Sequence, residues 1–126
     1  MLEDERIEYI INKTIIKLRA EGLLRDEARS AVQKTEDILR NYPYFKLSDQ
    51  PFTQNFCRKV DEAIDKIRGD YYFEIITMYY FDDVSRENIA AHFRTSESTI
   101  SRNRIRLVEK LSSILFPDDM IIDLLV

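Results

Sequence analysis

The stretch IAAHFRTSESTISRNRIRLVEKL, residues 89–111, decides the fold of this chain. It belongs to two segments with a helical pattern, 86–93 and 97–116, which are separated by only three residues. Serine is a favourable N-cap, so Ser96 marks the start of the second helix, and the proline at position 117 ends it. Two helices joined by so short a connection predict a helix-turn-helix.

The two sides of the second helix differ in polarity. At 100° per residue, the apolar residues fall on one side and are expected to face the core. The small residue Ala90 in the first helix would let the second helix cross closely. The inner side carries Ile100, Leu107, Leu111 and Ile114, and the outer side carries Ser98, Arg102 and Ile105.

The rest of the chain predicts more helices and no strands, so the expected fold class is all-α. Only 2 glycines and 3 prolines occur in 126 residues, which argues against a turn-rich β fold. We expect a helical N-terminal region over 1–69, a helix-turn-helix region over 70–116 and an acidic, apolar tail over 117–126. The expected helices before residue 86 run from about Glu3 to Glu21, from a cap at Asp26 to a point before Pro43, from Pro51 to Gly69, and from a cap at Asp70 through Tyr71 to about Phe81.

The charge pattern permits contact with nucleic acid. The net charge is -4, yet residues 86–111 hold six arginines and lysines against three acidic residues, a local charge of +3. A local basic face matters more for phosphate binding than the overall charge. We see neither a signal peptide nor a membrane-spanning apolar run, and we expect a cytoplasmic protein. One cysteine and one histidine allow no internal disulfide and no Cys/His zinc site, and no cofactor or metal is predicted.

Residues 89–111 resemble the helix-turn-helix of the fourth conserved region of bacterial sigma factors. The shared features are the Ile-Ala pair, an apolar residue at Phe93, then Ser-Glu-x-Thr-Ile, a basic stretch and a closing leucine. The preceding YYFEIITMYYFDDVS, residues 71–85, looks like the leading helix of that region. The resemblance covers about residues 70–116 and implies binding to double-stranded DNA.

Over its whole length the chain resembles phage transcriptional regulators of the ArpU/RinA type. The similarity includes KTEDILRNYPYFK, residues 34–46, and FCRKVDEAIDKIRGDYYFEIITMYYF, residues 56–81. The resemblance implies a regulator of late phage genes. Two positions depart from the sigma pattern. Arg94 replaces the usual turn glycine, which is tolerated if its φ stays negative. Asn103 and Arg104 stand where an inward apolar residue is usual, so either the helix is rotated or they meet partners such as Asp82 or Asp83.

Carried over position by position, the resemblance assigns roles in DNA binding. The candidates for contact with base edges are Glu97, Ser98, Ser101 and Arg102. An arginine at position 102 can bind guanine O6 and N7, and a glutamate at 97 can accept from cytosine N4. Ile105 would meet a thymine methyl group or serve an interface. The candidates for phosphate contact are Ser85, Arg86, Arg94, Thr95, Thr99, Arg106 and Lys110.

Each of these residues also has a simpler interpretation. Ser85 can serve as a helix cap without contacting DNA, and the other residues can simply lie on a helix face that is exposed to solvent. His92 lacks a nucleophile and an orienting carboxylate in the sequence, so no enzyme is predicted. Cys57 is expected to be a buried thiol, and the pairs Tyr71-Tyr72 and Tyr79-Tyr80 are expected in the core rather than as stacking platforms for single strands.

The sequence therefore predicts a sequence-specific DNA-binding transcriptional regulator, an activator of phage late genes. Two alternatives stay open. One is a protein-interaction adaptor that contacts RNA polymerase or a sigma factor, and the other is a phage DNA-packaging adaptor that uses the helix-turn-helix as a scaffold. A homodimer is expected, with the apolar surplus of the first helix as its interface.

Overall fold

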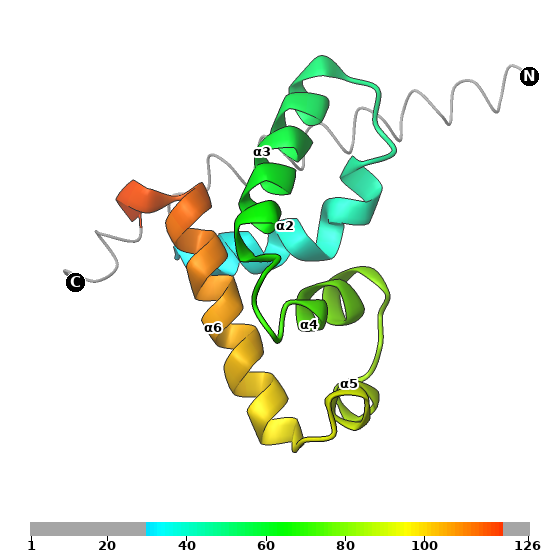
Figure 1. The fold of residues 1–126 in the computed structure, drawn as a ribbon. Coiled ribbons are helices and arrows are strands. Elements are labelled where there is room, and N and C mark those ends of the chain that lie inside the picture. The colour runs from blue at the N-terminus through cyan, green and yellow to red at the C-terminus, as the bar shows by residue number, and fades with distance from the viewer. Residues whose placement is uncertain (1–29, 120–126) are drawn as a thin grey trace, which may run out of the picture.

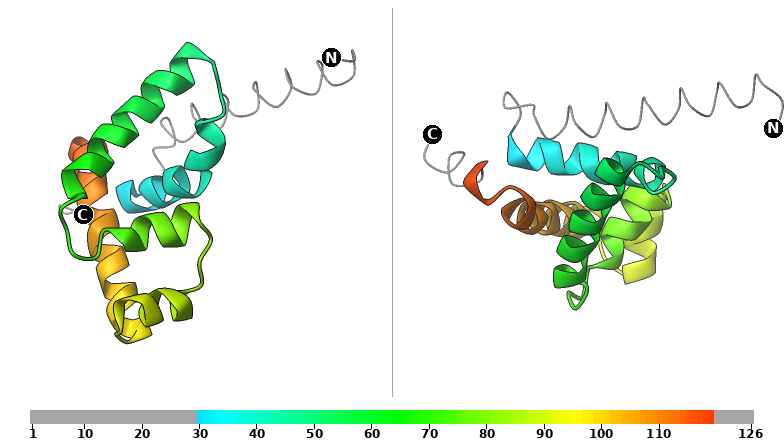
Figure 2. Two further views of the ribbon diagram at one scale, coloured as in Figure 1. Left: turned by 45° about the vertical axis from the view of Figure 1, so that its right-hand side comes forward. Right: turned by 90° about the horizontal axis from the view of Figure 1, so that it is seen from above.

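The computed structural model describes residues 30–119, and this part of the chain is all-α, as the sequence predicts. The long helix α6 contacts each of the other α-helices between residues 30 and 119 (Figures 1 and 2). The expected helix over 3–21 and the expected cap at Asp26 lie outside the described residues. The elements are α2 (Ala31–Phe45), α3 (Pro51–Ile67), α4 (Glu74–Ile76), the π-helical turn η1 (Thr77–Phe81), α5 (Arg86–Phe93) and α6 (Glu97–Leu115).

Local capping signals place most of the helix boundaries. Ser85 and Ser96 accept hydrogen bonds from backbone N–H groups of the first turns of α5 and α6, which confirms both predicted starts. Pro51 is the first residue of α3, where its missing N–H costs nothing. The capping box at the start of α2 joins Ser30 and Gln33, whose side chains each bind the backbone N–H of the other.

The expectation that this helix ends before Pro43 was wrong. The proline lies inside α2, which continues to Phe45. A proline removes one hydrogen bond from a helix, and here it lies in the last turn. Phe45 is 1% exposed and packs edge-on against Phe56 of α3. Burial of the Phe45 ring against α3 favours continuing the helix for this one further turn.

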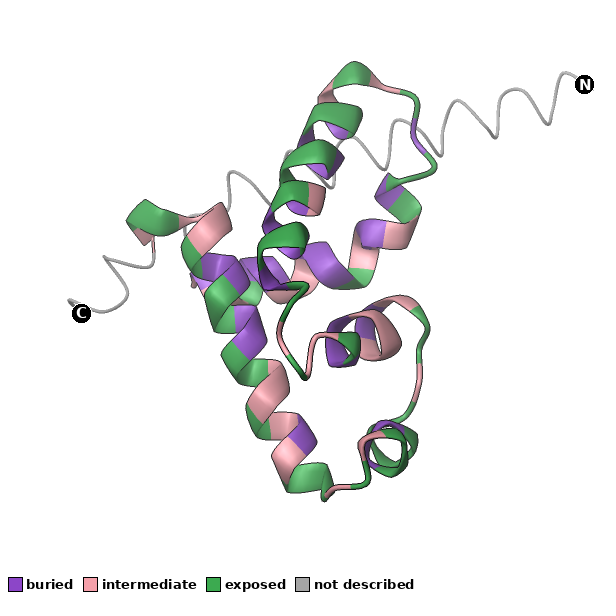
Figure 3. Ribbon diagram, viewed as in Figure 1, coloured by how far each residue is buried: buried purple, intermediate pink, exposed green. Residues whose placement is uncertain are grey.

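Two clusters of buried side chains form the core (Figure 3). The larger one joins α2, α3 and η1 to the C-terminal half of α6, where Leu107 and Leu111 are fully buried. The smaller one joins α4 and α5 to the start of α6 through Ile100, which is also fully buried. The predicted inner stripe of α6 is therefore confirmed, except that Ile114 is only half-buried.

The segment expected as one helix over 71–81 differs in detail. Only Glu74–Ile76 is a regular α-helix, and the chain then widens into η1. The wider turn is closed by the backbone N–H of Asp82, which donates to the carbonyl of Thr77 at 2.9 Å. The chain reverses directly afterwards at Asp83, whose φ is +53°, a conformation that aspartate tolerates better than most residues.

A half-buried polar network joins α2, η1 and α6. Arg104 donates from Nη1 to Oε1 of Glu36 at 2.7 Å and to the hydroxyl of Tyr80 at 2.8 Å. Tyr80 in turn donates to the same carboxylate oxygen at 2.9 Å. Of the two alternatives for Arg104, a rotated helix or a polar partner, the structure shows the polar partner. The partners are Glu36 and Tyr80 rather than Asp82 or Asp83, which are both exposed.

This network makes a prediction about stability. We expect Glu36→Gln and Arg104→Gln each to lower the free energy of unfolding by about 2 kcal/mol, since each leaves a half-buried charge with a poorer partner. The double variant should lose less than the sum of the two, because the residues are in direct contact.

Urea unfolding of the wild type, the two single variants and the double variant measures this coupling. Asp82→Asn and Asp83→Asn serve as controls and should change stability by less than about 0.5 kcal/mol. Additive losses at Glu36 and Arg104 would contradict the network.

Candidate nucleic-acid interface

The turn between α5 and α6 is a left-handed cap. Arg94 has φ +55° and ψ +47°, and its N–H donates to the carbonyl of Ala91 at 3.2 Å. The N–H of Thr95 reaches back to the carbonyl of Ala90 at 3.0 Å, which closes a Schellman-type motif. The condition for tolerating an arginine here, a negative φ, is therefore not met, because the bond from the N–H of Thr95 to Ala90 closes only when Arg94 is left-handed.

Apolar packing holds α5 across the start of α6 (Figure 2). Ile89 and Ala90 of α5, Ile75 of α4 and Ile100 of α6 are all at most 5% exposed and form one cluster. The small side chain of Ala90 lies at this crossing, as the sequence predicts. Burial of these four residues determines which face of α6 points outward.

The outward face of α6 carries most of the predicted base contacts. Glu97, Ser98 and Arg102 are exposed, whereas Ser101 is half-buried. Arg102 makes one long hydrogen bond, 3.4 Å from Nη2 to Oγ1 of Thr99. Ile105 is 46% exposed.

Arg86 bridges the two helices of the motif. Its Nε donates to Oε1 of Glu97 at 3.2 Å, and its Nη1 donates to Oγ of Ser101 at 3.2 Å. Predicted as a phosphate contact, Arg86 thus binds two of the predicted base-contact residues in this structure. The contact keeps the Glu97 carboxylate at the edge of the outward face.

Arg106, another predicted phosphate contact, is held by Asp70. Its two terminal nitrogens donate to the two carboxylate oxygens at 2.8 and 2.9 Å, and its Nε donates to Oδ1 of Asn103 at 3.1 Å. The hydrogen bonds from Arg106 lower the pKa of Asp70 to about 2, and a further bond from the N–H of Tyr72 acts in the same direction. The Arg106 side chain therefore fastens the start of the 70–81 segment to α6.

The remaining residues predicted to contact phosphate make fewer bonds inside the fold than Arg86 and Arg106 do. Arg94 and Lys110 are exposed and make no ion pair within residues 30–119, and Thr95 is half-buried at the turn. Thr99 shares a hydrogen bond of 2.9 Å with Ser96, and Ser85 caps α5. Arg94, Arg102 and Lys110 are thus three exposed basic residues that form no ion pair within residues 30–119.

Other candidate residues have structural partners. The imidazole of His92 lies 2.9 Å from the carboxylate of Glu74, and both side chains are exposed. Cys57 is buried in the larger core, which raises the pKa of its thiol. Tyr80 is buried as expected, but Tyr71 is 75% exposed. Within residues 30–119 no cluster of three or more His, Cys, Asp or Glu is arranged to hold a metal ion.

Sequence reasoning missed three residues that organise this site, namely Asp70, Glu36 and Tyr80. Their partners lie 24 to 68 positions away in the sequence, so no local pattern marks them.

Comparison with known proteins adds no relative. No family model, no curated protein and no solved structure matches this chain. No helix in the described part of the chain is both long and apolar enough to cross a bilayer.

The pairing of Asp70 with Arg106 predicts a dependence of stability on pH. The pKa of Asp70 in the folded protein, about 2, lies below its ordinary value of 3.8. The stabilisation is therefore complete above about pH 4 and is lost as the pH falls toward 2. Because Arg106 is 43% exposed, we expect Asp70→Asn to cost only about 1 kcal/mol at pH 7.

Urea unfolding between pH 7 and pH 2.5 tests this expectation, and the difference between wild type and Asp70→Asn should shrink at the acidic end. Asp65→Asn removes a carboxylate from a fully surface pair and should change stability by less than about 0.5 kcal/mol at pH 7. A difference for Asp70→Asn that is constant down to pH 2.5 would refute the assignment.

The left-handed turn makes a second prediction. We expect Arg94→Gly to raise the free energy of unfolding by about 1 kcal/mol, since glycine adopts this conformation without a Cβ penalty. Arg94→Ala removes the same charge and keeps the penalty, so it should bring no gain. Thermal unfolding of both variants separates conformation from charge, and equal stabilities would contradict the strained turn.

Proposed function

We propose that this protein is a sequence-specific double-stranded DNA-binding transcriptional regulator that reads the major groove with the outward face of α6. The observation that carries the proposal is the exposure of Ser98 and Arg102 on the side of α6 opposite the buried Ile100. A major groove about 12 Å wide accepts a helix of about 10–12 Å diameter. An arginine at its centre can bind guanine through two hydrogen bonds.

The distribution of charge supports the same proposal. Three of the six basic residues between 86 and 111 are neutralised by acidic partners inside the fold: Arg86 by Glu97, Arg104 by Glu36 and Arg106 by Asp70. The three others, Arg94, Arg102 and Lys110, form no ion pair in the described part of the chain. In our proposal Arg102 reads a base, while Arg94 and Lys110 bind phosphates on either side and set the register.

Further attributes of this proposal rest on the sequence resemblance. The resemblance to phage regulators of the ArpU/RinA type suggests an activator of late phage genes in a bacterial cytoplasm, and contact with RNA polymerase is part of that suggestion. The start of the tail offers little to a protein partner, because Phe116 packs against the core and Asp119 pairs with the buried Lys34 at 2.9 Å. Residues 120–126 lie outside the described part of the chain.

Selection of binding sites from random duplex DNA, at low and at physiological salt, tests the proposal. We expect one motif to be enriched and to survive the higher salt. Arg102→Ala should then lose about 1–3 kcal/mol of binding free energy on that motif and relax the preference at one base pair. Arg58→Ala, on an exposed position of α3, removes the same charge and should leave binding unchanged.

Unselective binding that disappears at physiological salt would contradict the proposal and favour an adaptor that uses the helix-turn-helix as a scaffold. Equal losses for Arg102→Ala and Arg58→Ala would show that only net charge matters.

A further inference from the structure

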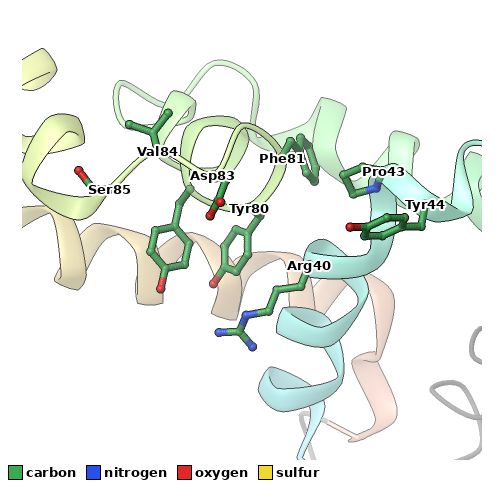
Figure 4. A pocket seen from close by; sticks show the side chains of 9 residues that line it. Arg40, Pro43, Tyr44, Tyr80, Phe81, Asp83, Val84 and Ser85 are labelled. Carbon is green, nitrogen blue, oxygen red and sulfur yellow. The ribbon is translucent and has the colours of Figure 1, made fainter.

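A groove lies on the side of the molecule between the end of α2 and the connection from η1 to α5 (Figure 4). Its cavity has a volume of about 630 Å³, within the range of specific binding sites. Aromatic side chains from two segments make its walls, and charged residues from the same two segments complete it. The residues that matter here are Arg40 and Tyr44 of α2, Tyr80 and Phe81 of η1, and Asp83 of the connection.

The groove lies beside an exposed apolar corner. Tyr44 is 59% exposed at its edge, and Leu47, three residues further along the chain, is 76% exposed. The other two large hydrophobic residues that the described part of the chain exposes, Tyr71 and Ile105, belong to the segment 70–116 that contains the helix-turn-helix. Tyr44 and Leu47 are joined by a backbone hydrogen bond of 3.1 Å and lie outside the proposed DNA face. Exposed apolar side chains that form one patch are typical of surfaces that bind another protein.

The groove carries one charge of each sign. The ring of Tyr80 lies between Arg40 and Asp83 (Figure 4), and the guanidinium is 5.8 Å from the ring centre. Arg40 makes only a long ion pair of 3.8 Å with Asp37 in its own helix, and its side chain is 51% exposed. Asp83 is exposed and makes no ion pair within residues 30–119. The two opposite charges do not pair with each other.

We infer that this groove is the contact surface for a second copy of the chain in a two-fold symmetric dimer. In such a dimer the same surface occurs on both subunits, so it must complement itself. This one can, because it holds an exposed aromatic side chain, Tyr44, at the edge of a hollow and carries one charge of each sign, Arg40 and Asp83. A two-fold rotation that brings Arg40 of one copy to Asp83 of the other pairs both sets of charges at once.

Charge reversal tests the pairing without DNA, so the result does not depend on the proposed DNA binding. Sedimentation equilibrium of the full chain should show a dimer. Arg40→Asp and Asp83→Lys should each raise the dimer dissociation constant by about 100-fold, roughly tenfold for each of the two symmetric pairs.

An equimolar mixture of the Arg40→Asp and Asp83→Lys proteins should regain a dimer, because both pairs are then again of opposite sign. Lys59→Asp and Glu62→Lys make the same charge changes on exposed positions of α3 and should leave the dimer intact. The inference fails if the wild type is a monomer at all concentrations, if the dimer is indifferent to either reversal, or if mixing restores nothing.

Discussion

The orientation of α6 about its own axis is the constraint on which the rest of the structure depends. Ile100 packs under α4 and α5, and Leu107 and Leu111 pack against α2 and α3, so α6 is held against the core both near its start and in its second half. A helix held in this way at both ends cannot rotate without exposing several fully buried side chains. The orientation of the outward face is thus a property of the core.

Ion pairs inside the fold refine the charge of that face. Three arginines of the segment 86–111 bind carboxylates from α2, α6 and the start of the 70–81 segment. Their positive charge is therefore less available to a phosphate than the sequence suggests. The sequence counts six basic residues in this segment, whereas the structure leaves only three of them, Arg94, Arg102 and Lys110, without an ion pair within residues 30–119. The positive charge that a phosphate can reach is therefore confined to fewer residues than the composition of the segment suggests.

Sequence reasoning predicted the features that local chemistry controls. The starts of α3, α5 and α6 follow from a proline and two serines, and the inner stripe follows from helical periodicity. Sequence reasoning failed where contacts with residues far away in the sequence determine where a helix ends or which partner a side chain binds. Burial of Phe45 against α3 carries α2 through Pro43, and the partner of Arg104 lies 68 positions away. The roles of the outward residues in DNA binding stay predictions.

The shared core has a consequence for thermodynamics. The larger hydrophobic cluster takes side chains from α2, α3 and α6 alike, and the hydrogen bonds of Arg104 join α6 to α2 and η1. The sequence boundary at residue 69 therefore does not separate two folding units, because a fragment beginning at 70 would leave Leu107 and Leu111 uncovered. By linkage, any ligand that binds only the native α6 raises the unfolding free energy of α2 and α3 by the same amount. The fraction of α6 that is bound to a ligand and the resistance of α2 and α3 to unfolding then report the same coupled equilibrium of folding and binding.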